Sequence, residues 1–257
     1  MYQIDLNSDL GESFGAYTIG LDDQIIDCVS SVNVACGWHA GDPVVMEKTV
    51  RLCKEKGVAV GGHPGYPDLM GFGRRRMKLS FDETRTYMKY QLGALAAFTK
   101  SYGMRVQHVS PHGALGNLIN YTDIEQARAV CAAVAEYDPE MIVICNAGGY
   151  MEQAAKEYQL RWASQVYADR AYNDDYSLVA RGTPGAVIRD PEAAVQRVVR
   201  MVKEGVVTSI TGKELPITAH GVCVHGDTPT AVQIVRDMRA ALEREGITIC
   251  KFGDFIR

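Results

Sequence analysis

The sequence predicts an α/β fold in which parallel strands close into a (β/α) barrel. Apolar runs typical of strands alternate with helical patterns seven or eight times along the 257 residues, as in parallel β/α folds. Several runs end in polar, glycine-flanked turns, and such folds bind ligands at that end of their strands. One barrel commonly has this length, so we expect a single domain over residues 1–257. An open doubly wound sheet is the alternative, because both folds need right-handed crossovers.

Local signals define the expected elements. Strands are predicted near residues 2–7, 31–36, 57–61, 104–109, 141–145, 161–166, 217–224 and 247–251. Helices are predicted from Pro43 to Lys56, Ser80 to about Tyr102, Thr122 to about Tyr137, Pro191 to Glu204 and Pro229 to Glu245. They begin at Asp-Pro or Thr-Pro pairs or at Ser/Thr-x-x-Glu capping boxes. The long loops at about 62–79 and 167–189 are expected to shape the rim of the barrel.

The composition argues against several functional classes. The formal net charge is −4, so the chain lacks the basic surface that nucleic acids or anionic membranes require. Its seven cysteines are scattered without a CxxC pair, which favours free thiols in a reducing compartment. No apolar stretch is long enough to span a membrane, and we expect a cytoplasmic protein. A phosphate-binding loop and a dinucleotide fingerprint are also missing, so ATP would need a partner to bind it.

The first predicted strand carries polar residues on one face. Asp5, Asn7 and Asp9 occupy every second position, and Glu12 follows the strand. Carboxylates on a barrel strand must be hydrogen-bonded, bound to a cation or exposed at the strand end. Asp5 fits a buried hydrogen-bonding anchor or a site residue equally well. Asp9, which is nearest the tip, is predicted to act in the site.

Two histidines follow consecutive predicted strands in similar settings. His39 and His63 both lie close to glycine and proline. Together with Asp9 they could bind a catalytic divalent metal that keeps an open coordination position. The same side chains could instead serve as acid, base and binding groups without a metal. No HxxxH or HxxEH motif decides between these interpretations.

The other histidines differ in their surroundings. His112 lies between proline and glycine in SPHGALGN, ahead of a possible helix start that could bind an anion. His225 in VHGDTP is followed by Asp227, which could orient it or only help to form the turn. His108 lies in mid-strand without glycine neighbours, so we expect a core histidine, and His220 is ambiguous for the same reason.

The two long loops contain arginines that suit an acidic ligand. Arg74 and Arg75 lie in GHPGYPDLMGFGRRR, and their guanidinium groups could bind a carboxylate. Asp169 and Arg170 lie in an irregular segment that is too polar for the core. We expect some of these side chains to bind substrate and others to pair with one another.

Six ordered motifs resemble one protein family. They are DLNSDLGESFG, VNVACGWHAGDP, GGHPGYPDLMGFGRR, PHGAL, YADRAYNDDYSLVARGTPGAVI and VHGDTP. Their order is similar to that of the LamB/YcsF family, from residue 5 to about residue 254. The resemblance implies a seven-stranded, TIM-like barrel similar to glycoside hydrolases and polysaccharide deacetylases. It also implies a part in the ATP-coupled opening of 5-oxo-L-proline to L-glutamate, together with B and C type subunits that carry the nucleotide chemistry.

This implied activity suggests roles for the candidate residues. Asp9 and His63 become the candidate base and acid, and His39 is grouped with them as catalytic. The remaining candidates are assigned to substrate binding: Asn7, Glu12, Arg74, Arg75, His112, Asp169, Arg170, His225 and Asp227. Whether a divalent metal takes part is left open.

The chain departs from the family pattern beside His112. The family is expected to have KPHGALYN, where this chain has Ser110 and Gly116. The missing lysine and tyrosine would remove a cation and an aromatic wall, and another lactam or amide substrate is therefore an alternative. Two further alternatives are a stand-alone metal-dependent amidohydrolase of the deacetylase type and a non-catalytic subunit that only binds substrate.

Overall fold

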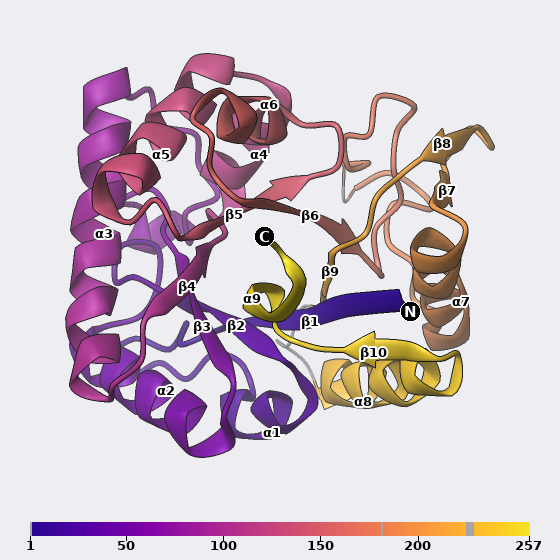
Figure 1. The fold of residues 1–257 in the computed structure, drawn as a ribbon, viewed down its shortest axis with the longest axis horizontal. Helices are drawn as coiled ribbons and strands as arrows, with labels where there is room; N and C mark the ends of the chain where they lie inside the picture. Colours follow the sequence, from indigo (N-terminus) through magenta and orange to yellow (C-terminus); the bar gives the residue numbers. More distant parts are fainter. Residues whose placement is uncertain (1, 181, 225–228) are drawn as a thin grey trace.

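Seven parallel strands form a closed barrel with helices around its outside (Figure 1). The computed structural model describes residues 2–180, 182–224 and 229–257. In barrel order the strands are β1 (Tyr2–Leu10), β2 (Ser31–Ala35), β3 (Ala59–His63), β4 (Val106–Val109), β5 (Ile142–Asn146), β6 (Trp162–Tyr167) and β9 (Gly221–Cys223). Strand β9 pairs with both β6 and β1, so the ring closes. The predicted barrel is therefore confirmed and an open sheet is excluded.

The last predicted strand does not belong to the ring. β10 (Ile247–Ile249) pairs only with the first residues of β1, whereas the next residues of β1 pair with β9. The short helix α9 (Phe252–Phe255) then crosses the amino end of the barrel, inside the ring in Figure 1. Phe252 is fully buried, and its ring packs so closely on Gly221 that a Cβ atom at Gly221 would overlap it. The C-terminal segment therefore closes this end of the barrel.

Most predicted helix starts are confirmed. The Asp42 side chain accepts from the backbone N–H groups of Val44 and Val45 at the start of α2 (Pro43–Lys56). Ser80 and Glu83 form a complete capping box on α3 (Phe81–Ser101). A further aspartate caps α7 (Pro191–Lys203), and α8 spans Pro229–Arg244. The predicted cap of α8 lies outside the described residues.

The predicted cap of the helix that precedes β5 is wrong by one residue. The cap of α5 (Ile124–Tyr137) is Asp123, whose side chain accepts from the N–H groups of Glu125 and Gln126. Thr122 instead ends the preceding helix. Asp123 is the better cap because its carboxylate also interacts favourably with the helix dipole.

Several short elements were not predicted. They are α1 (Asp22–Ile25), η1 (Ile26–Cys28), η2 (Leu69–Gly71), α6 (Tyr150–Glu157), the antiparallel pair β7 (Val206–Thr208) and β8 (Glu214–Pro216), and α9. The helix start suggested after His112 is confirmed as α4 (Gly113–Tyr121). Helix α6 begins without a side-chain cap, so its sequence carries no capping signal. In the described part of the chain, no helix is long and apolar enough to cross a membrane.

Candidate functional site

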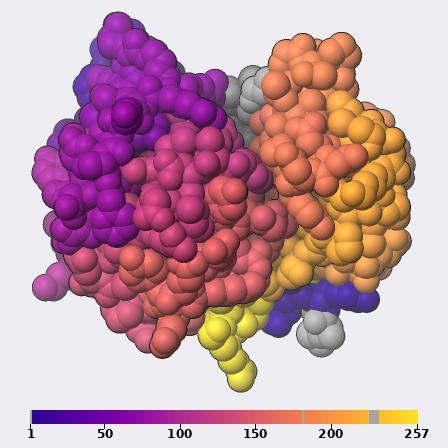
Figure 2. All heavy atoms as spheres, turned by 90° about the horizontal axis from the view of Figure 1, so that it is seen from above, coloured from indigo at the N-terminus to yellow at the C-terminus, as the bar shows by residue number. Residues whose placement is uncertain are grey.

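A cavity of about 920 Å³ opens at the carboxyl ends of the barrel strands. Its wall includes Asp9 from β1, His63 from β3 and His112 from the turn after β4. The loops after β3 and β6 contribute Arg74 and Arg170. In Figure 2 the purple and orange parts of the chain rise on either side of a hollow, opposite the yellow C-terminal segment.

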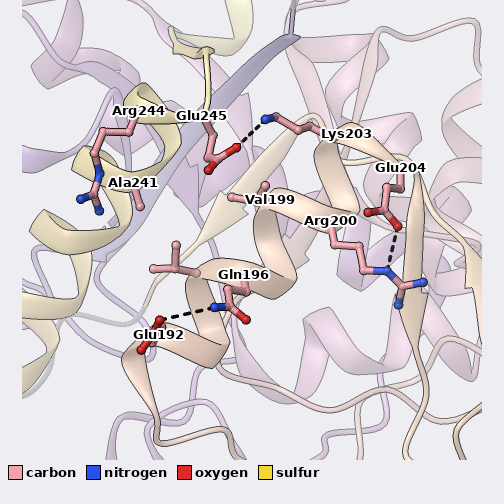
Figure 3. Close-up of a pocket in the computed structure, with 10 residues that line it drawn as sticks. Glu192, Gln196, Val199, Arg200, Lys203, Glu204, Ala241, Arg244 and Glu245 are labelled. Atoms are coloured by element: carbon pink, nitrogen blue, oxygen red, sulfur yellow. Dashed lines mark hydrogen bonds and ion pairs between the residues drawn. The ribbon is translucent and has the colours of Figure 1, made fainter.

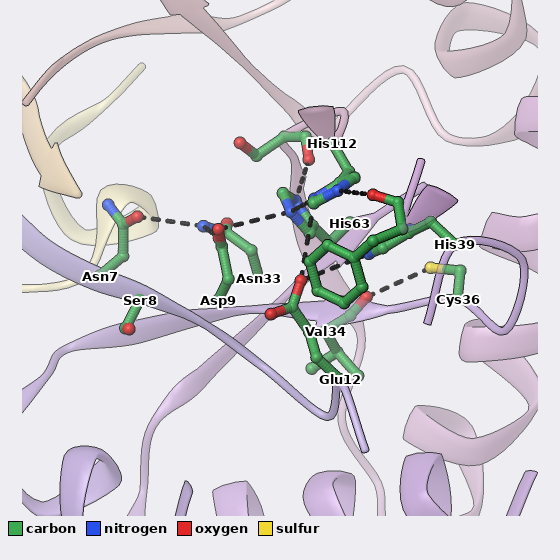
Figure 4. A network of polar contacts seen from close by, with 12 residues as sticks. Asn7, Ser8, Asp9, Glu12, Asn33, Val34, Cys36, His39, His63 and His112 are labelled. Carbon is green, nitrogen blue, oxygen red and sulfur yellow. Dashed lines mark hydrogen bonds and ion pairs between the residues drawn. The ribbon is translucent and has the colours of Figure 1, made fainter. Parts of the chain in front are cut away.

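Three histidines and one glutamate meet beside this cavity (Figure 4). His63 Nε2 lies 2.9 Å from His112 Nδ1, and the rings of His39 and His112 stack in parallel with 3.8 Å between their centres. Glu12 Oε1 lies 3.4 Å from His39 Nε2 and 3.7 Å from His112 Nδ1. One ligand atom from each of the four side chains lies within 4.8 Å of the others, so the group could hold a metal ion.

A glycine lets the loop after β3 cover these rings. Gly73 has a left-handed backbone, with φ of 61°. A Cβ atom there would lie 2.7 Å from His39 Cβ and 2.8 Å from His112 Cδ2, closer than a side chain can approach. The Gly73 carbonyl also accepts a hydrogen bond from Ala114 at the start of α4. The glycine-rich loop sequence therefore serves to close the site from one side.

Backbone carbonyls fix the protonation of two of the histidines. His63 Nδ1 lies 2.5 Å from the Ser110 carbonyl oxygen, and His112 Nε2 lies 2.9 Å from the Phe72 carbonyl oxygen. A carbonyl only accepts, so each of these nitrogens carries a proton, and in a neutral ring the other nitrogen has the lone pair. The lone pairs of His63 Nε2 and His112 Nδ1 then face each other at 2.9 Å. Two facing lone pairs repel, and a cation next to them would remove that repulsion.

Burial keeps protons off two of the clustered histidines. It lowers the pKa of His39 well below its usual value, and the neighbouring His112 and His63 lower that pKa further. Burial likewise lowers the pKa of His112, with a smaller lowering by His63 that Asp9 opposes. Neither ring nitrogen of His39 has a hydrogen-bond partner among the described residues. His39 and His112 therefore offer unprotonated nitrogens at neutral pH.

Asp9 is held from inside the barrel. Asn33 donates to Asp9 Oδ1 at 2.9 Å, while Asp9 Oδ2 lies 3.5 Å from His63 Nε2. Asn33 also donates to Asn7, whose own amide donates to Asp5. Asp5 is fully buried and accepts from two serine hydroxyls, and burial raises its pKa to about 7. Asp5 is thus the buried anchor of this polar face, and Asp9 is its end at the cavity.

Three other predicted residues, Arg75, Asn7 and Asp169, are not part of the described cavity lining. Arg75 forms an ion pair with Asp68, and among the described residues it is Arg74 and Arg76 that line the cavity from this loop. Asn7 is fully buried inside the barrel. Asp169 is partly buried next to Arg170 and is not part of the described lining. His225 and Asp227 lie outside the described residues.

The two remaining histidines have structural surroundings. His108 is fully buried, as expected of a core histidine, and its Nε2 lies 2.9 Å from Asn33 Oδ1. His220 precedes β9 at the amino end of the barrel, where its Nδ1 accepts from the Ser164 backbone N–H. Neither side chain is part of the described cavity lining.

Sequence reasoning missed several contributors to the site. Asn33 lies within an apolar run, and Arg76 resembles its two arginine neighbours. The carbonyls that orient the histidines leave no trace in the side-chain pattern. Ser110 and Gly116, which depart from the family pattern, both line the cavity. A Cβ atom at Gly116 would overlap the Pro111 carbonyl oxygen, so α4 requires glycine at this position.

A second hollow of about 580 Å³ lies between α7 and α8 (Figure 3). Its lining consists largely of exposed charged side chains that pair with each other, including Lys203 with Glu245 and Arg200 with Glu204. None of the residues predicted to act in a site lines it. The candidate site is therefore the cavity at the mouth of the barrel.

Known proteins resemble this chain over its whole length. The model of the LamB/YcsF family matches residues 4–257. A protein from Thermococcus onnurineus (strain NA1), named as the A subunit of 5-oxoprolinase, is 55% identical over 255 residues, which cover 99% of this chain and 100% of the relative. The crystal structure of the Lactam Utilization Protein from Thermus thermophilus is 44% identical, with a TM-score of 0.92 over 96% of this chain and 99% of that one.

More distant structures share only the fold. A family 4 carbohydrate esterase from Streptomyces lividans is 12% identical and has a TM-score of 0.51, with 96% of this chain and 91% of that chain covered. This likeness agrees with the barrel architecture expected from the sequence. The match to the family model and the full-length relatives establish that the chain belongs to the LamB/YcsF family.

Proposed function

We propose that this chain is the A subunit of a 5-oxoprolinase, and that the cavity at the barrel mouth binds 5-oxo-L-proline for hydrolysis to L-glutamate. The observation that carries the proposal is the presence of a carboxylate, Asp9, and a buried three-histidine cluster at one cavity. Full-length similarity to proteins with that name supports it. A cavity of about 920 Å³ is large enough for this small lactam together with water.

A divalent metal ion suits the histidine cluster. His39, His63, His112 and Glu12 would hold it through imidazole nitrogens and a carboxylate oxygen, a donor set typical of zinc and other first-row metals. The carbonyls behind His63 and His112 resemble the partners that orient metal-binding histidines. When bound, the metal would supply a Lewis acid beside the reacting carbonyl. His63 would then be a ligand, in place of the proton donor suggested by the sequence.

Asp9 is the group placed to move protons. One of its oxygens is held by Asn33, and the other lies 3.5 Å from His63 Nε2. Asp9 also lines the cavity, so its carboxylate can accept the proton of an attacking water. Asp9 can then pass this proton to the nitrogen of the lactam as the carbon–nitrogen bond breaks. This assignment needs Asp9 to be ionised before the water attacks.

Two arginines can bind the carboxylate of the substrate. The Arg74 guanidinium lies 5.2 Å from the centre of the Phe72 ring. Arg170 is buried and donates to the Val179 carbonyl at 2.6 Å. Both side chains line the cavity while these contacts restrict their motion, and guanidinium groups bind carboxylates in a defined geometry.

The reaction needs an energy source, and the sequence of this chain contains no known nucleotide-binding motif that would supply it. An unstrained five-membered lactam is a poor electrophile, and the sequence contains no phosphate-binding loop. Partner subunits of the B and C type would therefore bind ATP and activate the amide. Dependence on ATP suits an activity in the cytoplasm. The cysteines, all of which are free, suit the same compartment.

Glutamate formation from 5-oxo-L-proline tests this proposal. The purified chain is assayed alone, with its B and C partners, and with those partners but without ATP. Glutamate and ADP only in the complete mixture are expected. Turnover without ATP or partners would replace the proposal by a stand-alone metal-dependent amidohydrolase, which the histidine cluster favours as second candidate. No turnover, with partners proven active beside a homologous A chain, would refute it.

A further inference from the structure

The amide of Asn33 has all of its hydrogen-bonding groups in use. Asn33 lies on β2, and its nitrogen donates to Asn7 Oδ1 at 3.1 Å and to Asp9 Oδ1 at 2.9 Å. Its oxygen lies 2.9 Å from His108 Nε2. The whole set is buried inside the barrel apart from the Asp9 carboxylate, which reaches the cavity. Figure 4 shows the hydrogen bond between Asn7 and Asn33, with Asp9 beside Asn33.

Only one orientation of this amide is compatible with its neighbours. An ionised Asp9 carboxylate only accepts hydrogen bonds, so the Asn33 nitrogen must face it. The Asn33 oxygen is then turned to His108, and a neutral His108 must carry its proton on Nε2 to donate to that oxygen. Burial lowers the pKa of His108 to about 3, which keeps the ring neutral. His108 and Asp9 therefore favour the same orientation of the Asn33 amide.

The barrel makes room for His108 at some cost. Gly61 on β3 pairs with His108 on β4, and a Cβ atom at Gly61 would overlap His108 Nε2. The Phe252 ring also packs against His108, with 5.2 Å between the two ring centres. His108 Nδ1 has no hydrogen-bond partner among the described residues. A buried polar atom without a partner destabilises a protein, so an apolar side chain would serve the core better.

We infer that His108 and Asn33 are a positioning pair that holds the Asp9 carboxylate in its reactive orientation. The inference rests on the proposed role of Asp9 as proton acceptor. Neither His108 nor Asn33 lines the cavity in the described structure, so both act through Asp9 and neither touches substrate. Loss of the His108 hydrogen bond frees the Asn33 amide to rotate. The hydrogen bond from Asn33 to Asp9 Oδ1 then weakens, and the carboxylate shifts from its position beside the histidine cluster.

Two substitutions of His108 separate positioning from packing. The amide nitrogen of glutamine reaches the place of Nε2, whereas that of asparagine reaches only the place of Nδ1. In the assembled complex, we expect His108→Asn to lower kcat at least about tenfold with KM changed less than about threefold. His108→Gln is expected to restore kcat to within about threefold of wild type. His220→Gln, at the amino end of the barrel, is the matched control and should leave kcat unchanged.

The kinetic outcomes decide between the two explanations. Equal losses in His108→Gln and His108→Asn, or no loss in either, would overturn the positioning role. A loss in His220→Gln as large as that in His108→Asn would do the same, because it would mean that any histidine of the barrel matters through stability.

Nitrogen-15 NMR of the imidazole rings tests the pair without any activity. The expected result is a neutral His108 with its proton on Nε2 from pH 6 to pH 8. A proton on Nδ1, or a charged ring, would overturn the inference because Nε2 could not then donate to a correctly oriented Asn33. If the wild-type complex forms no glutamate, the proposed function fails, and the NMR result still decides whether the His108–Asn33 pair exists.

Discussion

Replacement of Asp5 by asparagine is expected to stabilise the protein above neutral pH. Asp5 is fully buried, and burial raises its pKa from 3.8 to about 7 against the opposing effect of its hydrogen bonds. The folded state therefore binds this proton more tightly than the unfolded chain does. As the pH rises from about 4 to about 7, the unfolded chain ionises first, so the free energy of unfolding falls in that window and stays low above it.

The size of the effect follows from the shift in pKa. Each unit corresponds to about 1.4 kcal/mol, so a shift from 3.8 to about 7 lowers the free energy of unfolding by at most roughly 4 kcal/mol. Asparagine at this position has no charge to bury, and its oxygen can still accept from Asn7 and Ser31. Asp5→Asn should therefore gain roughly 2 to 4 kcal/mol at pH 8 and almost nothing at pH 4.

Urea unfolding at pH 4, 6 and 8 measures this difference. Asp23→Asn is the control, because that side chain is 67% exposed and surface substitutions change stability by less than about 0.5 kcal/mol. The reasoning would be refuted if Asp5→Asn were less stable than wild type at pH 8. It would also be refuted if the difference between the two proteins did not grow with pH.

Three further outcomes are expected. Arg74→Gln should raise KM for 5-oxo-L-proline at least about tenfold, because a guanidinium that binds a carboxylate is lost. Arg75→Gln should change KM little, since Arg75 pairs with Asp68. Steady-state kinetics compare the two variants. Removal of bound metal by a chelator should abolish glutamate formation, and zinc or another first-row divalent ion should restore it; full activity in metal-free protein would contradict this. Asp123→Ala should lower the free energy of unfolding by about 1 kcal/mol in urea titrations, and Thr122→Ala should not, because Asp123 is the cap.

The barrel was predictable because its strands and helices alternate in the chain. Which strands belong to the closed ring was not predictable. The run at 247–251 looks like any other strand, and only its pairing with the start of β1 keeps it out of the ring. The third strand begins two residues later than predicted, at Ala59, because Gly57 still ends α2 in a left-handed conformation. As a result His63 is the last residue of β3, where the sequence placed it in the following loop.

The candidate site was partly predictable for a similar reason. Parallel strands bring their carboxyl ends together, so polar residues at those ends, such as Asp9, His63 and His112, could be grouped without a structure. Contacts that depend on loop paths could not. The approach of Glu12 to the histidines follows from the turn after β1. The interior position of Asn33 depends on the register of β1 and β2, which no single strand reveals.

The proton-accepting role of Asp9 is the central claim, and Asp9→Asn in the assembled complex tests it most directly. Asparagine keeps the size of the side chain and cannot accept the proton. We expect the rate of glutamate formation to fall at least about a hundredfold, while 5-oxo-L-proline still binds with nearly unchanged affinity. Glutamate formation within about threefold of the wild-type rate would contradict the account, because the cavity would then act without its carboxylate base.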